Sequence, residues 1–215
     1  MYVPAHFAVR DAAPLQALIA ANAFGLLISP PAGPGGMVAS HVPFLYEPDP
    51  APHGRLVCHL AAANGQAAAL DGQEVLCIFQ GVHGYVSPNW YAKKPAVPTW
   101  NYTAVHAYGR ASTTRDPARL RDIVDRLSAI YEGPGGWKLS DEPDSFAESM
   151  LRGIVGIEIP VDRLEGKFKL SQNRPAADVA GVIANLRRLG GDANLALADA
   201  MQQAADDAAA RRARD

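Results

Sequence analysis

The sequence predicts an antiparallel β-barrel of the α+β class, with helices inserted between its strands. Short apolar and β-branched stretches bounded by turn residues are typical of such a barrel. Helical stretches do not alternate strictly with the strands, which argues against a parallel α/β sheet. The glycine-rich stretch 30–36 lacks the GxGxxG spacing and leads into a strand, so it is not a Rossmann dinucleotide site. The six expected strands are residues 24–29, 37–46, 55–63, 75–86, 102–113 and 153–160.

The first helix precedes two strands joined by a Pro- and Gly-rich connection. Asp11 can cap a helix that runs to about Ala21, because a carboxylate accepts hydrogen bonds from the free amides of a helix start. The strand 37–46 contains Pro43, which has no N–H to donate. We therefore expect this strand at a sheet edge, or broken at the proline. A broken strand leaves backbone groups free to meet a ligand.

The third strand, 55–63, carries apolar residues on one face and His59 on the other. Asn64 and Gln66 follow its end, where a short helix over 66–70 is expected to begin. Free amide groups at a helix start form a natural phosphate seat.

Residues 75–109 are the most informative stretch of the chain. They begin and end as strand, and the connection between is rich in aromatic rings and polar groups. Long irregular segments in compact domains are usually functional. Flat apolar rings beside amide, hydroxyl and ammonium donors suit a planar, polar-edged, anionic ligand. The alternative is that these rings only close one end of a barrel.

The C-terminal part is predicted to be mostly helical. Apolar residues at helical spacing share one face of an amphipathic helix, Asp116–Tyr131, and two glycines separate a final pair of helices. The expected elements are helices at 116–131 and 143–151, the strand 153–160 with an extended continuation over 161–170, and a helical hairpin formed by 178–189 and 192–210.

Composition excludes several classes of protein. The formal net charge of −2 argues against a strongly electrostatic nucleic-acid binder. The two cysteines, Cys58 and Cys77, lie in predicted strands and are expected to be small buried residues of a cytoplasmic protein. No apolar run approaches the ~20 residues of a membrane span, and the N-terminus does not read as a signal peptide.

Several sequence blocks resemble the PaiB-type FMN-binding negative transcriptional regulators. The blocks fall in the family's order and span residues 1 to about 185. They are Met-Tyr-Val-Pro-Ala-His-Phe at 1–7, Ser-His-Val-Pro-Phe at 40–44, His-Leu-Ala at 59–61 with Asn64 and Gln66, Phe-Gln-Gly at 79–81, Tyr-Val-Ser-Pro at 85–88, Trp-Tyr at 90–91, Val-Pro-Thr-Trp-Asn-Tyr at 97–102 with His106, and Gly-Lys-Phe-Lys-Leu-Ser-Gln-Asn-Arg at 166–174.

The resemblance implies the FMN-binding split β-barrel, similar to the pyridoxamine phosphate oxidases, with peripheral helices and a C-terminal helical hairpin. In that fold two subunits pair and FMN lies in the groove between them, so a homodimer is expected. The expected domains are a split barrel over 1–175 and a helical extension over 176–215, packed on the barrel or on the partner chain.

The resemblance also implies where FMN binds. The ring edge is placed along Ser40, His41, Val42 and Pro43, mainly through backbone groups, and the phosphate near His59, Leu60, Asn64 and Gln66. The family usually has Arg at the position of Ala62 and Pro at that of Gly65, and here Val82 and Gly84 also replace a Pro and a larger residue. Without that Arg, the charge for the phosphate has to come from Lys94, Lys169 or Arg174.

Further candidates lie outside these two strands. Trp90, Tyr91 and Trp100 are candidates for ring cover or for the dimer interface, and Asn101 for a polar contact. The run after residue 168 concentrates donors that are costly to bury without partners, and we expect it at the ligand or the subunit interface; the alternative is a solvated loop. Its candidate residues are Lys169, Ser171, Gln172, Asn173 and Arg174.

Other chemistries find little support. The histidines share no metal-ligand spacing, so no metal site is predicted, and the serines lack the context of a hydrolase nucleophile. Three functions stay open: a regulator of transcription, an FMN-dependent oxidoreductase with an unknown small substrate and with His83 or Tyr85 as proton donor, or a flavin carrier or sensor. The final hairpin could be mistaken for a DNA-reading helix-turn-helix, but its second helix is acidic, so DNA is a weakly supported partner.

Overall fold

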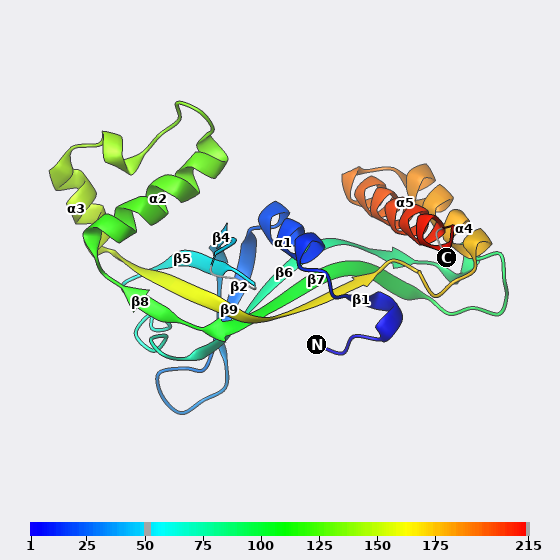
Figure 1. Cartoon of the computed structure of the whole chain (residues 1–215), viewed down its shortest axis with the longest axis horizontal. Helices are drawn as coiled ribbons and strands as arrows, with labels where there is room; N and C mark the ends of the chain where they lie inside the picture. The colour runs from blue at the N-terminus through cyan, green and yellow to red at the C-terminus, as the bar shows by residue number, and fades with distance from the viewer. Residues whose placement is uncertain (50–52, 214–215) are drawn as a thin grey trace. The chain divides into compact units, whose positions relative to one another are not determined.

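The computed structural model describes residues 1–49 and 53–213, and within them the chain is an antiparallel sheet with five α-helices (Figure 1). The strands are β1 (Ala8–Val9), β2 (Phe24–Ser29), β3 (Val38–Pro43), β4 (Leu45–Glu47), β5 (Arg55–Ala61), β6 (Glu74–Val86), β7 (Thr99–Arg110), β8 (Ser112–Thr114) and β9 (Ile154–Lys169). The helices are α1 (Ala12–Ala21), α2 (Pro117–Glu132), α3 (Asp144–Arg152), α4 (Ala176–Leu189) and α5 (Asp192–Arg212), with 3-10 turns at Ala5–Phe7, Pro88–Trp90 and Leu139–Asp141.

The strand order along the sheet is β3-β2-β6-β7-β9-β5-β4, with β1 and β8 also paired to β9. β2 pairs antiparallel with β3 and β6, and β5 with β4 and β9. This mixture of an antiparallel sheet and inserted helices confirms the predicted α+β class. β3 ends at Pro43 and lies at the end of the strand order, as the missing proline N–H predicts.

The chain divides into two compact units, and the long strands β6, β7 and β9 contribute residues to both. Unit 1 comprises Met1–Asp11, Gln80–Val105 and Glu165–Asp215. Unit 2 comprises Ala12–Phe79 and His106–Leu164. The predicted domain boundary at residue 175 stays a prediction.

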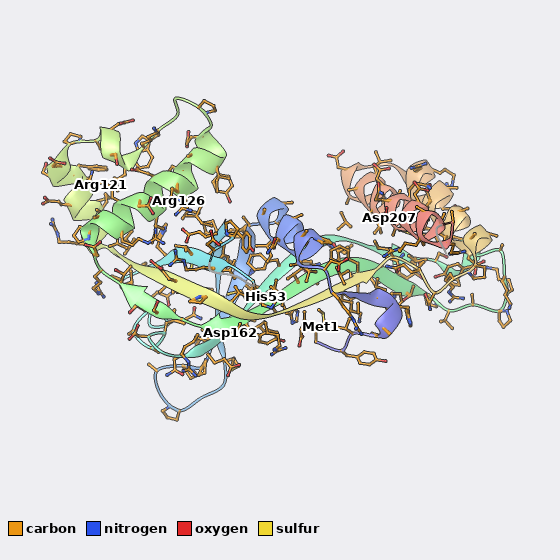
Figure 2. All side chains as sticks on the ribbon, in the orientation of Figure 1. Met1, His53, Arg121, Arg126, Asp162 and Asp207 are labelled. Atoms are coloured by element: carbon orange, nitrogen blue, oxygen red, sulfur yellow. The ribbon has the colours of Figure 1, made fainter. Side chains whose placement is uncertain are left out.

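In unit 2, helix α2 packs on the sheet. Ile123 and Leu127 of α2 meet Leu45 of β4 and Val57 of β5 in one buried cluster. The Asp116 carboxylate caps α2 by accepting from the N–H of Arg119, at 2.9 Å. Beside the cluster, arginines of α2 and β5 form ion pairs with Glu47 and Glu158; Figure 2 labels Arg126 of this group on α2.

Unit 1 is built around the hairpin of α4 and α5, which lie side by side (Figure 1). Leu186 and Leu197 bury their side chains together with Val86 of β6 and Tyr91. A Cβ at Gly84 would lie 2.7 Å from Cδ2 of Leu197, so α5 occupies the space that a larger residue of the family would need. None of the helices in the described residues combines the length and apolar character needed to cross a membrane.

The predicted short helix at 66–70 is wrong. The N–H groups of Ala67 and Ala69 donate to Asn64 O and Gln66 O, each three residues back, so this segment consists of consecutive turns. The Gln66 side chain is drawn into the sheet, as described below. The predicted strand 153–160 and its extended continuation form the single strand β9.

Candidate functional site

Ser40, Asn64 and Gln66 form a hydrogen-bonded group in unit 2, the turn cluster, where the turns after β5 meet β3. Ser40 Oγ donates to Gln66 Oε1 at 2.6 Å and accepts from Asn64 Nδ2 at 3.1 Å. The N–H of Gln66 donates to Asn64 Oδ1 at 2.9 Å. All three residues were predicted as flavin contacts, and the fold brings them together.

Gln66 fixes this cluster to the sheet. Its side chain is buried, and Nε2 donates to Leu27 O at 3.1 Å and to Ser29 Oγ at 3.0 Å, both on β2. Its oxygen accepts from Ser40, so the amide is fully engaged with protein groups. Gln66 therefore holds the turns in position, and its own amide is not available to a ligand.

The other predicted ring-edge residues lie along β3. His41 is exposed and stacks on Phe24 with ring centroids 6.0 Å apart, whereas the Val42 side chain is buried. Because β3 is the last strand on its side of the sheet, its outer edge has no neighbouring strand among the described residues. Backbone groups on that edge suit hydrogen bonds to a polar ring edge.

His59 has a polar atom with no partner. Its Nδ1 is buried without a hydrogen bond among the described residues, and Leu60 beside it is buried. Burial lowers the pKa of His59, so at neutral pH the imidazole is uncharged and offers one hydrogen-bond donor and one acceptor. A buried nitrogen without a partner is rare in proteins, and a hydrogen bond to a ligand oxygen would satisfy it.

The turns after β5 leave room for a phosphate group. A Cβ at Gly65 would meet nothing within 4 Å, so the space beside that backbone is open. Ala62 donates its N–H to Gly153 O at 2.8 Å and brings no charge. The open space beside Gly65 therefore leaves room for an FMN phosphate, while the positive charge that balances it has to come from other residues.

Lys169, at the end of β9 in unit 1, is one of the predicted cations. Its Nζ donates to Thr99 Oγ1 at 2.5 Å and to Trp100 O. Partial burial lowers the pKa of Lys169, and the positive charges of Lys167 and Arg174 lower it further. Clustered cations repel one another, and an anion bound beside them relieves that repulsion.

Asn101 and Ser171 form a buried pair in the same unit. Asn101 Nδ2 donates to Ser171 Oγ at 2.9 Å and to Met201 Sδ at 3.3 Å. Ser171 adopts φ 67°, in the left-handed region that non-glycine residues seldom occupy. The pair fixes the loop after β9 to β7 and α5.

The remaining candidates of this loop are Gln172, Asn173 and Arg174, and each has a different environment. Gln172 Nε2 donates to Phe168 O at 2.6 Å, and its oxygen accepts from the N–H of Leu170, so it closes the loop on itself. Asn173 is exposed. The Arg174 guanidinium lies 4.4 Å from the ring centroid of Tyr91.

The aromatic candidates divide between core and surface. Tyr91 is buried in the cluster under the hairpin, and Trp90 packs against it, so neither ring presents a face to solvent as Trp100 does. Trp100 is 54% exposed and lies between His83, stacked at 6.4 Å, and Tyr85, edge-on at 6.2 Å. Lys94 is exposed and donates to Pro88 O within its own loop.

The candidates thus form two groups, one in each unit. Sequence reasoning missed Ser29, Thr99 and Met201, which hold Gln66, Lys169 and Asn101. Ser29 and Thr99 are common strand residues, and Met201 has the spacing of a core position on a helix. Thr99 lies within the family block 97–102, which was a signal that could have found it, whereas Ser29 and Met201 carry no such signal.

Comparison with known proteins identifies the family of the chain. The family described as "Putative FMN-binding domain" matches residues 1–163. The chain is 34% identical over 192 residues to the protease synthase and sporulation protein PAI 2 of Bacillus subtilis, covering 87% of this chain and 89% of that protein. An uncharacterized protein of Emericella nidulans is 34% identical over 244 residues, covering 94% of this chain and 97% of that protein.

Two solved flavoproteins share the fold. The FAD and heme binding protein of Mycobacterium smegmatis superposes with a TM-score of 0.59 at 16% identity, covering 80% of this chain and 78% of that one. The flavocytochrome Anf3 of Azotobacter vinelandii gives 0.58 at 19% identity, covering 78% and 72%. The split-barrel fold predicted from the resemblance is confirmed. The chain belongs to the PaiB-type FMN-binding family, and its cofactor is FMN.

Proposed function

We propose that the chain is a homodimeric FMN-binding regulator of transcription. The observation that carries the regulatory part is its 34% identity, over most of both chains, to the Bacillus subtilis protein named for protease synthesis and sporulation.

The proposed flavin site uses backbone groups of β3 for the ring edge and the turns after β5 for the phosphate. Support comes from the orphaned His59 Nδ1, the open space at Gly65 and the turn cluster that holds this backbone in place. In unit 1, the cationic Lys169 and the loop closed by Gln172 are proposed as a further group of flavin contacts.

Replacing Lys169 or Gln172 by alanine tests the contribution of unit 1. We expect both variants to lower the flavin-to-protein absorbance ratio of the freshly purified protein, K169A through lost charge and Q172A through an opened loop. Lys138, exposed in unit 2, supplies the matched control K138A, which is expected to retain full flavin. Unchanged flavin content in both test variants would reject this part of the placement.

The hairpin of α4 and α5 is not the proposed DNA reader. Both helices bury their apolar faces in the core of unit 1, and Arg187 is paired with Asp199 across the hairpin at 3.2 Å. A DNA contact by the regulator would have to use another surface, with steep salt dependence.

Gel shifts with promoter DNA of the source genome test the regulatory role. Sequence-preferring retardation at low protein concentration, lost as salt is raised, is the expected result. Binding equal to that of random DNA at every salt concentration would argue against a regulator.

An FMN-dependent oxidoreductase is the second candidate. The observation that favours it is the exposed group of His83 and Tyr85 around Trp100, which sets two proton-bearing side chains beside a flat ring. Bleaching of the bound flavin by NADPH or NADH, with turnover when an electron acceptor is added, would select this function. A flavin that neither nicotinamide reduces would exclude these reductants as its donors.

A further inference from the structure

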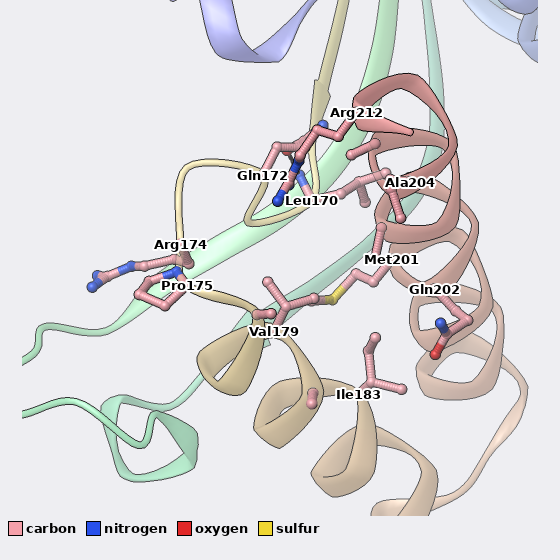
Figure 3. Close-up of a pocket in the computed structure, with 15 residues that line it drawn as sticks. Leu170, Gln172, Arg174, Pro175, Val179, Ile183, Met201, Gln202, Ala204 and Arg212 are labelled. Carbon is pink, nitrogen blue, oxygen red and sulfur yellow. Dashed lines mark hydrogen bonds between the residues drawn. The ribbon is translucent and has the colours of Figure 1, made fainter. Parts of the chain in front are cut away.

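A cavity of about 400 Å³ opens in unit 1 between α4, α5 and the loop after β9 (Figure 3). Val179 and Ile183 of α4 and Met201 of α5 form its apolar wall. Sites that hold small molecules measure roughly 300 to 1,000 Å³, are mostly apolar and carry few polar groups. This cavity has those properties.

The cavity exists because the two helices pack closely along only part of their length. In its first half α5 buries Leu197, Ala198 and Met201 against the core. Further along, the residues facing α4 are alanines, among them Ala204, Ala205 and Ala208. A methyl group is too short to fill the space that a leucine would fill, so the helices leave a gap beyond Met201.

The ionisable residues that line the cavity are all basic. Its ionisable residues are Arg174 and Arg212, and none of the described residues that line it is an acid. Figure 3 shows Arg212 extending from α5 toward Gln172, whereas Arg174 points away from the cavity. Arg212 is therefore the cation at the cavity, with the amide-bearing Gln172 opposite it.

We propose that this cavity binds a small amphipathic anion, a monocarboxylate with an apolar body. A guanidinium group donates two parallel hydrogen bonds to a carboxylate. The apolar part of the ligand would cover Val179, Ile183 and Met201, which a phosphate or a sugar could not do without burying unpaired polar groups. The lining of this cavity shares no residue with the turns after β5 or with β3, where the ring edge and phosphate of the flavin are proposed.

Calorimetric titration of the FMN-loaded protein with decanoate tests whether the cavity recognises the negative charge of the ligand. We expect saturable binding of one decanoate per chain, and binding of the neutral decanol weaker by about tenfold or more, because it cannot pair with a guanidinium. R212Q is expected to weaken decanoate binding by about tenfold, whereas R211Q, which changes the neighbouring arginine outside the lining, leaves it near the wild-type value.

A second pair of variants tests the position of the apolar body. A205L fills the cavity and is expected to abolish decanoate binding, while A210L, the same change outside the lining, keeps it. Flavin content and thermal midpoint of each variant show that the fold is retained. No saturable binding to the wild type, equal binding of decanol, or equal effects within either pair of variants would overturn the proposal.

Discussion

Gln66 shows how a single side chain can organise a site without facing the ligand. Its amide joins the turns after β5 to Leu27 and Ser29 on β2 and to Ser40 on β3. Each hydrogen bond is modest alone, but Gln66, Leu27 and Ser29 are buried, so a lost partner leaves unsatisfied atoms there. The position of the proposed phosphate-binding backbone therefore depends on this amide.

We predict that Gln66→Ala destabilises the protein by about 2 to 4 kcal/mol, since it removes several buried hydrogen bonds. Urea unfolding of the wild type and the variant gives the difference in unfolding free energy. Flavin content should fall in the same variant, because the turns lose their attachment to the sheet.

The control for this prediction is Gln73→Ala, which truncates an exposed glutamine of the same unit. Its effect should remain within about 0.5 kcal/mol, as for most surface changes. Equal stabilities of the Gln66 and Gln73 variants would mean that the turn cluster contributes nothing measurable to the fold.

At the scale of elements, ion pairs hold α2 to the sheet. Glu47 of β4, with a side chain 11% exposed, accepts from Arg55 Nε at 2.7 Å and pairs with Arg126. Glu158 of β9 accepts from Arg119 Nε at 2.6 Å and from Arg55 Nη1 at 2.8 Å. Two carboxylates, on β4 and β9, thus connect one arginine of β5 with two arginines of α2.

The ionic group predicts a pH dependence of stability. Burial raises the pKa of Glu47, but hydrogen bonds and charges from Arg126 and Arg55 outweigh it, and the net pKa lies below the ordinary 4.5. A carboxyl group whose pKa is lowered in the folded state stabilises it fully above the unfolded pKa. That contribution is lost as pH falls below about 4.5 and through the lowered value.

Glu47→Gln is therefore expected to cost about 2 kcal/mol at pH 7, because it removes the charge from a nearly buried ionic group. The cost should shrink as the pH falls below about 4.5 and through the lowered pKa of Glu47, because the wild-type carboxylate then also loses its charge. Unfolding midpoints measured from pH 3 to pH 7 check this. Glu148→Gln, an exposed glutamate of α3, is the control, and a cost of Glu47→Gln that does not change with pH would contradict the electrostatic origin.

The sequence predicted a structural feature correctly where neighbouring residues determine it. It failed where the feature depends on a partner far away along the chain. The break after β3 follows from Pro43 alone, and the extent of α2 follows from its apolar residues at helical spacing. The turns at 66–70 were mistaken for a helix because Gln66 binds a carbonyl 39 positions away. The strand β1 is two residues long and is held by β9, so no periodicity could show it.

The same distinction applies to the site. Asn101 and Ser171 were both predicted as candidates, but their hydrogen bond joins positions 70 residues apart, and nothing in either segment indicates the pairing. Tyr91 was predicted with Trp90 and Trp100 as ring cover or interface. Its burial depends on the hairpin that packs over it from the C-terminus.

At the scale of the whole molecule, the remaining prediction is the homodimer. Large exposed apolar side chains that gather on a surface often mark an interface or a ligand site. In unit 1 Trp100 and Tyr85 are such residues, and the resemblance places Trp100 at the flavin or at the second subunit. We expect the purified protein to be a dimer with one FMN per chain.

Trp100→Ser is predicted to lower the flavin content or the fraction of dimer, because the serine provides neither a ring for stacking nor apolar area for an interface. Light scattering after gel filtration gives the mass, and absorbance of the same peak gives the flavin per chain. Trp137→Ser removes another exposed tryptophan, from unit 2, and should leave both quantities unchanged. A wild-type monomer that carries a full complement of FMN would show that a single chain suffices to hold the flavin.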